Sequence, residues 1–154
     1  MKEIHCYRFE ANIYTDSELV FECLNKDKHV LKWNTQIIEN IYEGSENDLQ
    51  EGATFITRQK IDKKVYELEA KYTKYDPPYN VCVETATKEG ISKTEYRLKV
   101  VPAGTELTVD VYLIPSNWMY KTFTNMFKWA FKHVYDDQFN NFIEYVYKVQ
   151  KQRN

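Results

Sequence analysis

Tyrosine is the residue type with the clearest potential to bind or orient a ligand in this sequence. The 154-residue chain contains 13 tyrosines together with 8 phenylalanines. A tyrosine joins an apolar ring to a hydroxyl that needs a hydrogen-bond partner, so a surface rich in tyrosine suits a place that is half dry and half wet. The composition therefore favours a pocket wall.

The residue types that perform acid–base chemistry form only one candidate pair. His133 and Asp137 are spaced one turn apart if they lie on a helix, where they could form an oriented proton-transfer pair. Such pairs are more often solvated contacts between residues i and i+4. We therefore assign no catalytic residue and keep these two as the only candidates.

Metal, covalent and phosphate-binding motifs are absent from the sequence. His5, His29 and His133 do not follow HxH, HxxxH or HExxH spacing. Three cysteines, at positions 6, 23 and 82, lack CxxC spacing and are interpreted as reduced thiols. There is no GxSxG motif, and the four glycines form no phosphate-binding loop. We expect no metal and no cofactor.

The charge balance indicates which partners to exclude. The 21 basic and 23 acidic side chains give a formal charge of −2, which provides no overall attraction to nucleic acid or anionic lipid. The first ten residues lack the order of a signal peptide, and no apolar run is long enough to span a bilayer. We therefore expect a cytoplasmic protein with no nucleic-acid partner and no integral membrane contact.

The longest predicted element is a helix from Ser116 to Val149, with Ser116 as its N-cap after Pro115. Its first half has one apolar stripe at three- and four-residue spacing: Phe123, Met126, Phe127, Ala130 and Val134. We expect this stripe to cover the mouth of a pocket. The apolar residues of the second half spread more widely, which indicates either burial on two sides or a bend near residues 133–137.

The residues before this helix predict a sheet interrupted once. A strand at 3–15 is followed by two short helices, one capped by Asp16 and one running from Lys26 toward Trp33. Six alternating segments then follow, near 37–43, 53–60, 66–72, 81–85, 93–100 and 107–113. Short turns make consecutive strands antiparallel neighbours. The prediction is one α+β domain over residues 1–154, with a curved antiparallel sheet of about seven strands around the long helix.

A curved sheet of that width exceeds what one helix can cover, so we expect a cavity between the sheet and the long helix. Inward-facing positions of the strands and helix supply a mostly apolar wall with a few hydroxyls, as in small-molecule sites. The candidate ligand contacts are Tyr7, Phe9, Phe55, Thr57, Tyr66, Leu68, Tyr72, Tyr96, Leu98, Val109, Phe123, Phe127 and Ala130. The alternative is that these side chains fill a solid core.

Two tryptophans of the long helix, Trp118 and Trp129, lie off its apolar stripe. An outward-facing pair could join a second copy of the chain in a homodimer or contact a membrane headgroup layer. Alternatively, the short helices or a loop cover them.

Several short motifs, taken in order, resemble the START-like or SRPBCC superfamily, which includes polyketide cyclase and dehydrase, lipid-transport and plant pollen-allergen families. These are residues 16–21 after the first strand, Trp33, Tyr75-Asp-Pro-Pro78, Tyr96-Arg-Leu98 and Gly104-Thr-Glu-Leu-Thr108. The resemblance covers nearly the whole chain. It implies a helix-grip fold with a deep hydrophobic pocket whose ligands differ between families.

Three functions follow as hypotheses. The first is an intracellular binding protein for a small hydrophobic ligand, lipid-like or polyketide-like. The second is a polyketide cyclase- or dehydratase-like enzyme that moves protons with pocket tyrosines or His133. The third is a protein-interaction module that uses Trp118 and Trp129.

Overall fold

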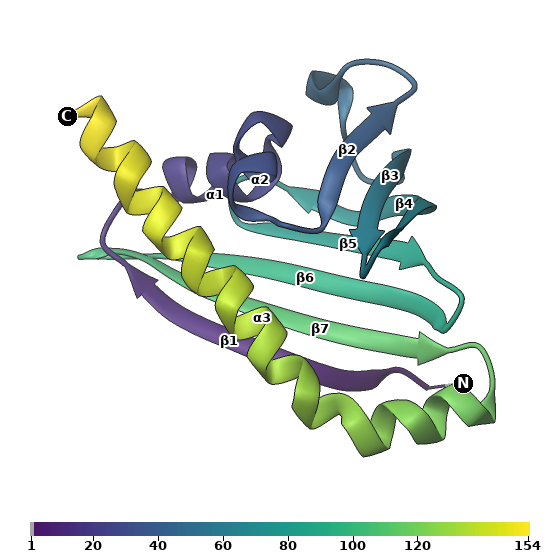
Figure 1. Ribbon diagram of the computed structural model, residues 1–154. Coiled ribbons are helices and arrows are strands. Elements are labelled where there is room, and N and C mark those ends of the chain that lie inside the picture. The colour runs from purple at the N-terminus through teal and green to yellow at the C-terminus, as the bar shows by residue number, and fades with distance from the viewer. Residues whose placement is uncertain (1) are drawn as a thin grey trace.

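Alternating apolar residues build one curved, seven-stranded antiparallel sheet (Figure 1). The computed structural model describes residues 2–154. The strands are β1 (Ile4–Ile13), β2 (Ile37–Tyr42), β3 (Thr54–Ile61), β4 (Lys64–Asp76), β5 (Asn80–Ala86), β6 (Gly90–Val101) and β7 (Gly104–Pro115). Their spatial order is β1-β7-β6-β5-β4-β3-β2. Strands β2 to β7 therefore form a meander, and β1 closes the edge beside β7.

Three α-helices accompany the sheet, and the predicted α+β helix-grip fold is confirmed. They are α1 (Ser17–Asn25), α2 (Asp27–Trp33) and α3 (Trp118–Arg153), with one short 3-10 helix, η1 (Glu46–Asp48). The chain crosses from β1 to β2 through α1 and α2, which places both short helices on the same side of the sheet as α3 (Figure 1). No helix in the described part of the chain is long and apolar enough to cross a bilayer.

The start of α3 differs from the prediction by one residue. The N-cap is Asn117, whose side-chain oxygen accepts a hydrogen bond from the backbone N–H of Tyr120 at 3.0 Å. Ser116 had been predicted in that position, but its hydroxyl instead donates to the carbonyl of Lys88 at 3.2 Å. The Ser116 side chain is therefore committed to the turn before β6 and is not free to cap the helix.

The second half of α3 is buried on two sides, which is one of the two arrangements predicted from the sequence. The ring of Phe139 stacks on Phe9 of β1 at 5.3 Å, and Phe142 meets Trp33 of α2 edge to face at 5.0 Å. The Tyr145 hydroxyl lies 2.7 Å from Nδ1 of His29. This half is therefore held between the sheet and the short helices. Figure 1 shows that α3 is also bent, in its green first half.

The first half of α3 does not cover a pocket mouth. The large side chains of its apolar stripe are solvent-exposed, Ala130 is half-buried, and Trp118 and Trp129 are 72% and 67% exposed. The reason is the position of the helix, since α3 contacts the sheet mainly at β1, with a smaller contact to β7. Thr124 is the buried residue of this half. The short helices do not cover the two tryptophans.

The core consists of two clusters. The larger one joins β1, β6 and β7 to all three α-helices. The smaller one contains Phe55, Ala70, Tyr72 and Val81 on β3, β4 and β5. Phe21 of α1 packs against both clusters. The sheet is thus covered by α3 mainly at β1, by α1 at β6 and β7, and by α2 at β2.

Candidate functional site

A cavity of about 110 Å³ lies between the sheet and the two short helices, where the two core clusters meet. Strand alternation directs Phe55, Thr57 and Tyr72 to the same face, because side chains two residues apart share one side of a strand. Tyr96 of β6 and Trp33 of α2 complete the wall at its covered side. The described residues that line the cavity include no Asp, Glu, Lys, Arg or His.

The polar atoms of the wall are amides and hydroxyls. Asn25 of α1 donates to the hydroxyl of Tyr75 at 3.0 Å and accepts from the hydroxyl of Tyr72 at 3.3 Å. Burial raises the pKa of the Tyr72 and Tyr96 phenols above the ordinary tyrosine value. Both phenols therefore remain protonated at neutral pH and act as neutral hydrogen-bonding groups.

The predicted ligand contacts fall into three places. Phe55, Thr57, Tyr72 and Tyr96 line the cavity. Tyr7, Phe9, Leu98 and Val109 pack in the larger core cluster or against it. The remaining positions, Tyr66, Leu68, Phe123, Phe127 and Ala130, line neither the cavity nor the four other main hollows among residues 2–154.

The second and third groups differ from the first because of where α3 lies. The Tyr7 ring stacks on Tyr135 of α3 at 5.1 Å, so α3 fills the space beside β1. Tyr66 is 42% exposed near the start of β4, where α3 makes no substantial contact. The open space is therefore between the sheet and the short helices, and the predicted space between the sheet and α3 is filled by side chains.

Sequence reasoning missed the wall residues that come from the short helices and from β5. They are Phe21, Leu24, Asn25, Val30 and Trp33 on the helices, and Val81, Val83 and Thr85 on the strand. The β5 residues carry a signal, since their alternation marks one inward face. The helix residues carry none, because an apolar helix face does not show which part of a sheet it covers.

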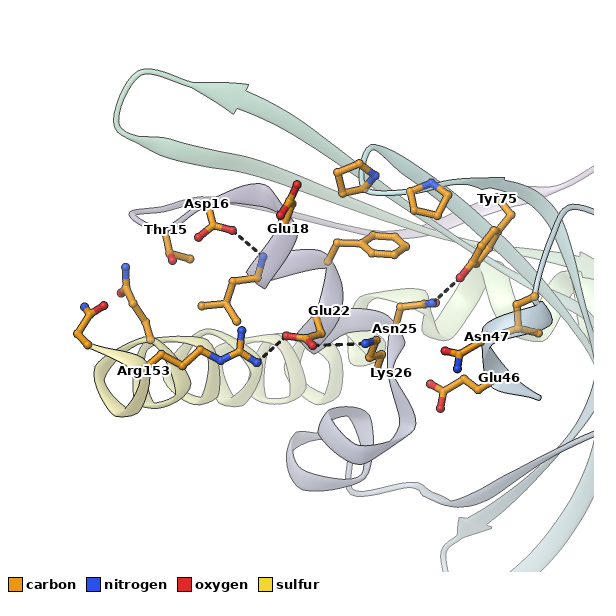
Figure 2. A pocket seen from close by; sticks show the side chains of 17 residues that line it. Thr15, Asp16, Glu18, Glu22, Asn25, Lys26, Glu46, Asn47, Tyr75 and Arg153 are labelled. Atoms are coloured by element: carbon orange, nitrogen blue, oxygen red, sulfur yellow. Dashed lines mark hydrogen bonds and ion pairs between the residues drawn. The ribbon is translucent and has the colours of Figure 1, made fainter.

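A larger, open groove of about 840 Å³ lies outside the cavity (Figure 2). It runs between α1, the η1 loop, the β4–β5 turn and the end of α3. Its central charge is Glu22, held by Arg153 at 2.7 Å and Lys26 at 3.5 Å. Burial opposes ionisation of Glu22, but the hydrogen bond from Arg153 and the nearby positive charges outweigh it and lower the pKa.

Two side chains separate this groove from the inner cavity. Phe21 and Asn25 line both hollows. Figure 2 shows Asn25 directed at Tyr75, whose ring lies 6.5 Å from that of Phe21. Phe21 and Asn25 therefore form a partition between the two hollows.

The structure does not bring the candidate acid–base pair together. His133 and Asp137 are both exposed, and no hydrogen bond or ion pair joins them in the described chain. The neighbouring Asp136 is the residue with contacts, since it accepts from the Tyr7 hydroxyl at 2.5 Å and from Lys132 at 2.7 Å. Neither His133 nor Asp137 lines the cavity.

The sequence matches one known protein family. Residues 14–144 match the family described as Activator of Hsp90 ATPase homolog 1-like protein, which is most of the chain. The chain belongs to this AHSA1-like family. The family is of the SRPBCC type, so the START-like resemblance is confirmed. No curated protein matches the chain.

Solved structures share the fold of this AHSA1-like protein at low sequence identity. A protein of unknown function from Staphylococcus aureus has a TM-score of 0.75 and 16% identity, with 97% of each chain covered. A protein from Nitrosomonas europaea has a TM-score of 0.70 and 12% identity, covering 97% of this chain and 96% of its own. An AHSA1-like protein from Aeromonas hydrophila has a TM-score of 0.61 and 16% identity, covering 97% and 94%.

Proposed function

We propose that this AHSA1-like protein binds a small hydrophobic molecule in the cavity beneath α1 and α2. The observation that carries the proposal is the wall itself, which is mostly apolar, uncharged and provided with a few hydroxyls and amides. That combination is typical of sites that hold and orient small molecules.

The volume of the cavity limits the size of the ligand. At about 110 Å³ it is smaller than the roughly 300–1,000 Å³ of sites for drug-sized ligands. A dry cavity of roughly 150 Å³ accepts benzene, so a ligand near the size of one aromatic ring matches this space. A larger lipid-like or polyketide-like ligand requires the partition at Phe21 and Asn25 to open toward the outer groove.

A variant that fills the cavity tests this proposal. Val83 lines the cavity from β5, so Val83→Phe places a ring in the ligand space. Val65→Phe is the matched control, because Val65 is exposed on β4 and lines no described hollow. We expect ring-sized apolar compounds to raise the melting temperature of the wild type and of Val65→Phe, but not of Val83→Phe.

Two results would contradict ligand binding in this cavity. One is a panel of single-ring and two-ring compounds, quinones, flavonoids and fatty acids that leaves the wild-type melting temperature unchanged. The other is a Val83→Phe variant that is folded and still responds to the same compounds as the wild type.

We propose protein association through α3 as a second candidate function, favoured by one specific observation. The first half of α3 exposes seven large apolar side chains, named here the exposed α3 face: Trp118, Met119, Phe123, Met126, Phe127, Trp129 and Val134. Large exposed apolar patches mark interaction sites, and these seven side chains lie within one half of a single helix. A second copy of the chain is the proposed partner, because a two-fold axis would let the same side chains bury one another.

Light scattering over a range of protein concentrations tests this second candidate. We expect the wild type to dimerise and Trp118→Ser/Trp129→Ser to remain monomeric, since two exposed rings no longer contribute to the interface. The control is Trp118→Phe/Trp129→Phe, which keeps the face aromatic and should still dimerise. A wild type that is monomeric up to roughly 100 μM, a concentration far above the Kd of a stable dimer, contradicts the proposal.

A further inference from the structure

We infer that the cavity selects a neutral ligand that carries a hydrogen-bond donor, and that Asn40 of β2 accepts that hydrogen bond. This inference rests on the proposed ligand-binding function and specifies its ligand class. It follows from two properties of the wall, the absence of charge and one buried oxygen without a partner.

The wall provides no counter-ion for a charged ligand. The described side chains that line the cavity are apolar, amide, hydroxyl or aromatic. Asp27 is the acidic group nearest to the Asn40 amide, and its Oδ1 already accepts hydrogen bonds from Asn40 and from the Tyr42 hydroxyl, each at 2.9 Å. Transfer of an unpaired carboxylate or ammonium group into such a space is strongly unfavourable. The cavity should therefore reject acids and amines.

The orientation of the Asn40 side chain is determined by Asp27. The Asn40 amide nitrogen Nδ2 lies 2.9 Å from Oδ1 of Asp27. A carboxylate only accepts hydrogen bonds, so the Asn40 atom that faces it must be the NH₂ group. The Asn40 oxygen Oδ1 is therefore the amide atom that does not face Asp27.

That oxygen lacks a hydrogen-bond partner among residues 2–154. Oδ1 of Asn40 is buried from solvent and accepts no hydrogen bond from any residue in the described chain. A buried acceptor without a donor is unfavourable, and a ligand N–H or O–H removes this penalty once a small rotation of the Asn40 side chain turns Oδ1 toward the cavity. An apolar ligand of the same shape leaves the penalty in place, so the site discriminates between the two.

Neighbouring groups complete a polar end of the cavity. Asn40 lies opposite Thr57 in the β2–β3 ladder, and both residues line the cavity. The Thr57 side chain is buried, and among residues 2–154 its oxygen has one long hydrogen bond, from Nε2 of Gln59 at 3.4 Å. A ligand hydroxyl can donate to Asn40 at this end while its ring lies among Phe55, Trp33 and Val83.

Three ring-sized probes of similar shape test the inference on the intact chain: phenol, toluene and benzoate. Isothermal titration calorimetry at neutral pH gives the affinity of each. A purely apolar pocket prefers toluene, because toluene leaves water more readily than phenol. We expect the reverse order here, with phenol bound roughly tenfold more tightly than toluene and benzoate not bound, since one buried hydrogen bond decides the comparison.

Asn40→Leu removes the acceptor. The variant should still bind toluene, and its ratio of phenol affinity to toluene affinity should fall to about one or below. Asn47→Leu, in the outer groove, is the control and should keep the wild-type preference. Should Asn40→Leu fail to fold, NMR of the wild type replaces it. Phenol, but not toluene, should then shift the side-chain amide signals of Asn40.

The outcomes separate the two proposals. Toluene binding as tightly as phenol, or benzoate binding best, overturns the inference while the cavity remains a ligand site. Phenol that leaves the Asn40 signals in place also overturns it. If none of the three probes binds and the broader panel fails as well, the proposed function falls and the inference falls with it.

Discussion

A buried carboxylate, Asp110, lies on the outer face of the sheet. Charged side chains surround it, whereas the described residues that line the cavity carry no charge. The Asp110 side chain has no exposed surface. Nε of Arg8 donates to it at 2.8 Å, Arg97 donates at 2.5 Å, and Nε2 of His5 lies 2.7 Å away. Burial alone would raise the pKa of Asp110, but hydrogen bonds from these three residues outweigh it and hold the pKa well below its usual range.

Asp110→Asn should therefore destabilise the protein by about 2 kcal/mol, measured by urea denaturation. The loss is moderate because Arg8, Arg97 and His5 are each half-exposed and regain water. The control is Asp137→Asn at an exposed position of α3, which should change stability by less than about 0.5 kcal/mol. Equal effects of the two substitutions would show that the Asp110 contacts contribute nothing.

The same carboxylate predicts how stability depends on pH. Its folded pKa lies below the unfolded value of about 3.9, so the unfolded state binds more protons as acid is added. The contribution of Asp110 is fully present above pH of about 4 and is lost as pH falls toward the folded pKa. The wild type should lose more free energy of unfolding below pH 4 than Asp110→Asn does. Parallel acid profiles would contradict this.

At the scale of elements, α3 is one helix with two different environments. Its second half contacts the sheet and both short helices, whereas its first half exposes most of its apolar side chains. Tertiary packing supplies most of the stability of a helix in a protein, so the first half depends more on local interactions than the second. We therefore expect the N-cap to contribute measurably to the stability of the first half.

Asn117→Ala should weaken the start of α3 by about 1 kcal/mol, because it removes the acceptor for the backbone N–H of Tyr120. Amide hydrogen exchange of Tyr120, followed by NMR, reports the change directly. Ser116→Ala is the matched control and should leave this exchange rate unchanged. A larger effect at Ser116 would show that the capping assignment is wrong.

At the scale of the whole molecule, the helices protect the sheet unevenly. Strand β7 lies between two neighbours and adjoins α3, whereas β2 is an edge strand at the opposite side and has α2 as its main helical neighbour. The cavity lies between these regions, so fewer buried contacts join β2 and β3 to the main core. The β2–β3 side should open at a lower free energy.

Native-state hydrogen exchange tests this asymmetry. We expect amides of β7 to exchange at least about tenfold more slowly than ladder amides of β2 and β3. A ring-sized ligand should slow exchange in β2 and β3 more than in β7, because these two strands contribute Asn40, Phe55 and Thr57 to the wall. Uniform exchange across the sheet would contradict the two-cluster description of the core.

The fold of this protein could be predicted from local patterns along the chain. Strand alternation, proline and glycine positions and the long uninterrupted C-terminal segment specify the elements and their order, because these signals are local in the chain. The same alternation identified Phe55, Thr57, Tyr72 and Tyr96 as inward-facing, and these residues do line the cavity.

The location of the cavity depends on how the helices pack against the sheet, which the sequence did not predict. The position of α3 over β1 filled the region beside Tyr7 and Phe9 and left the cavity under α1 and α2. The packing of helices against a sheet depends on contacts between residues far apart in sequence, which no local pattern records. For the same reason, the free oxygen of Asn40 and the buried surroundings of Asp110 became visible only when distant strands were brought together.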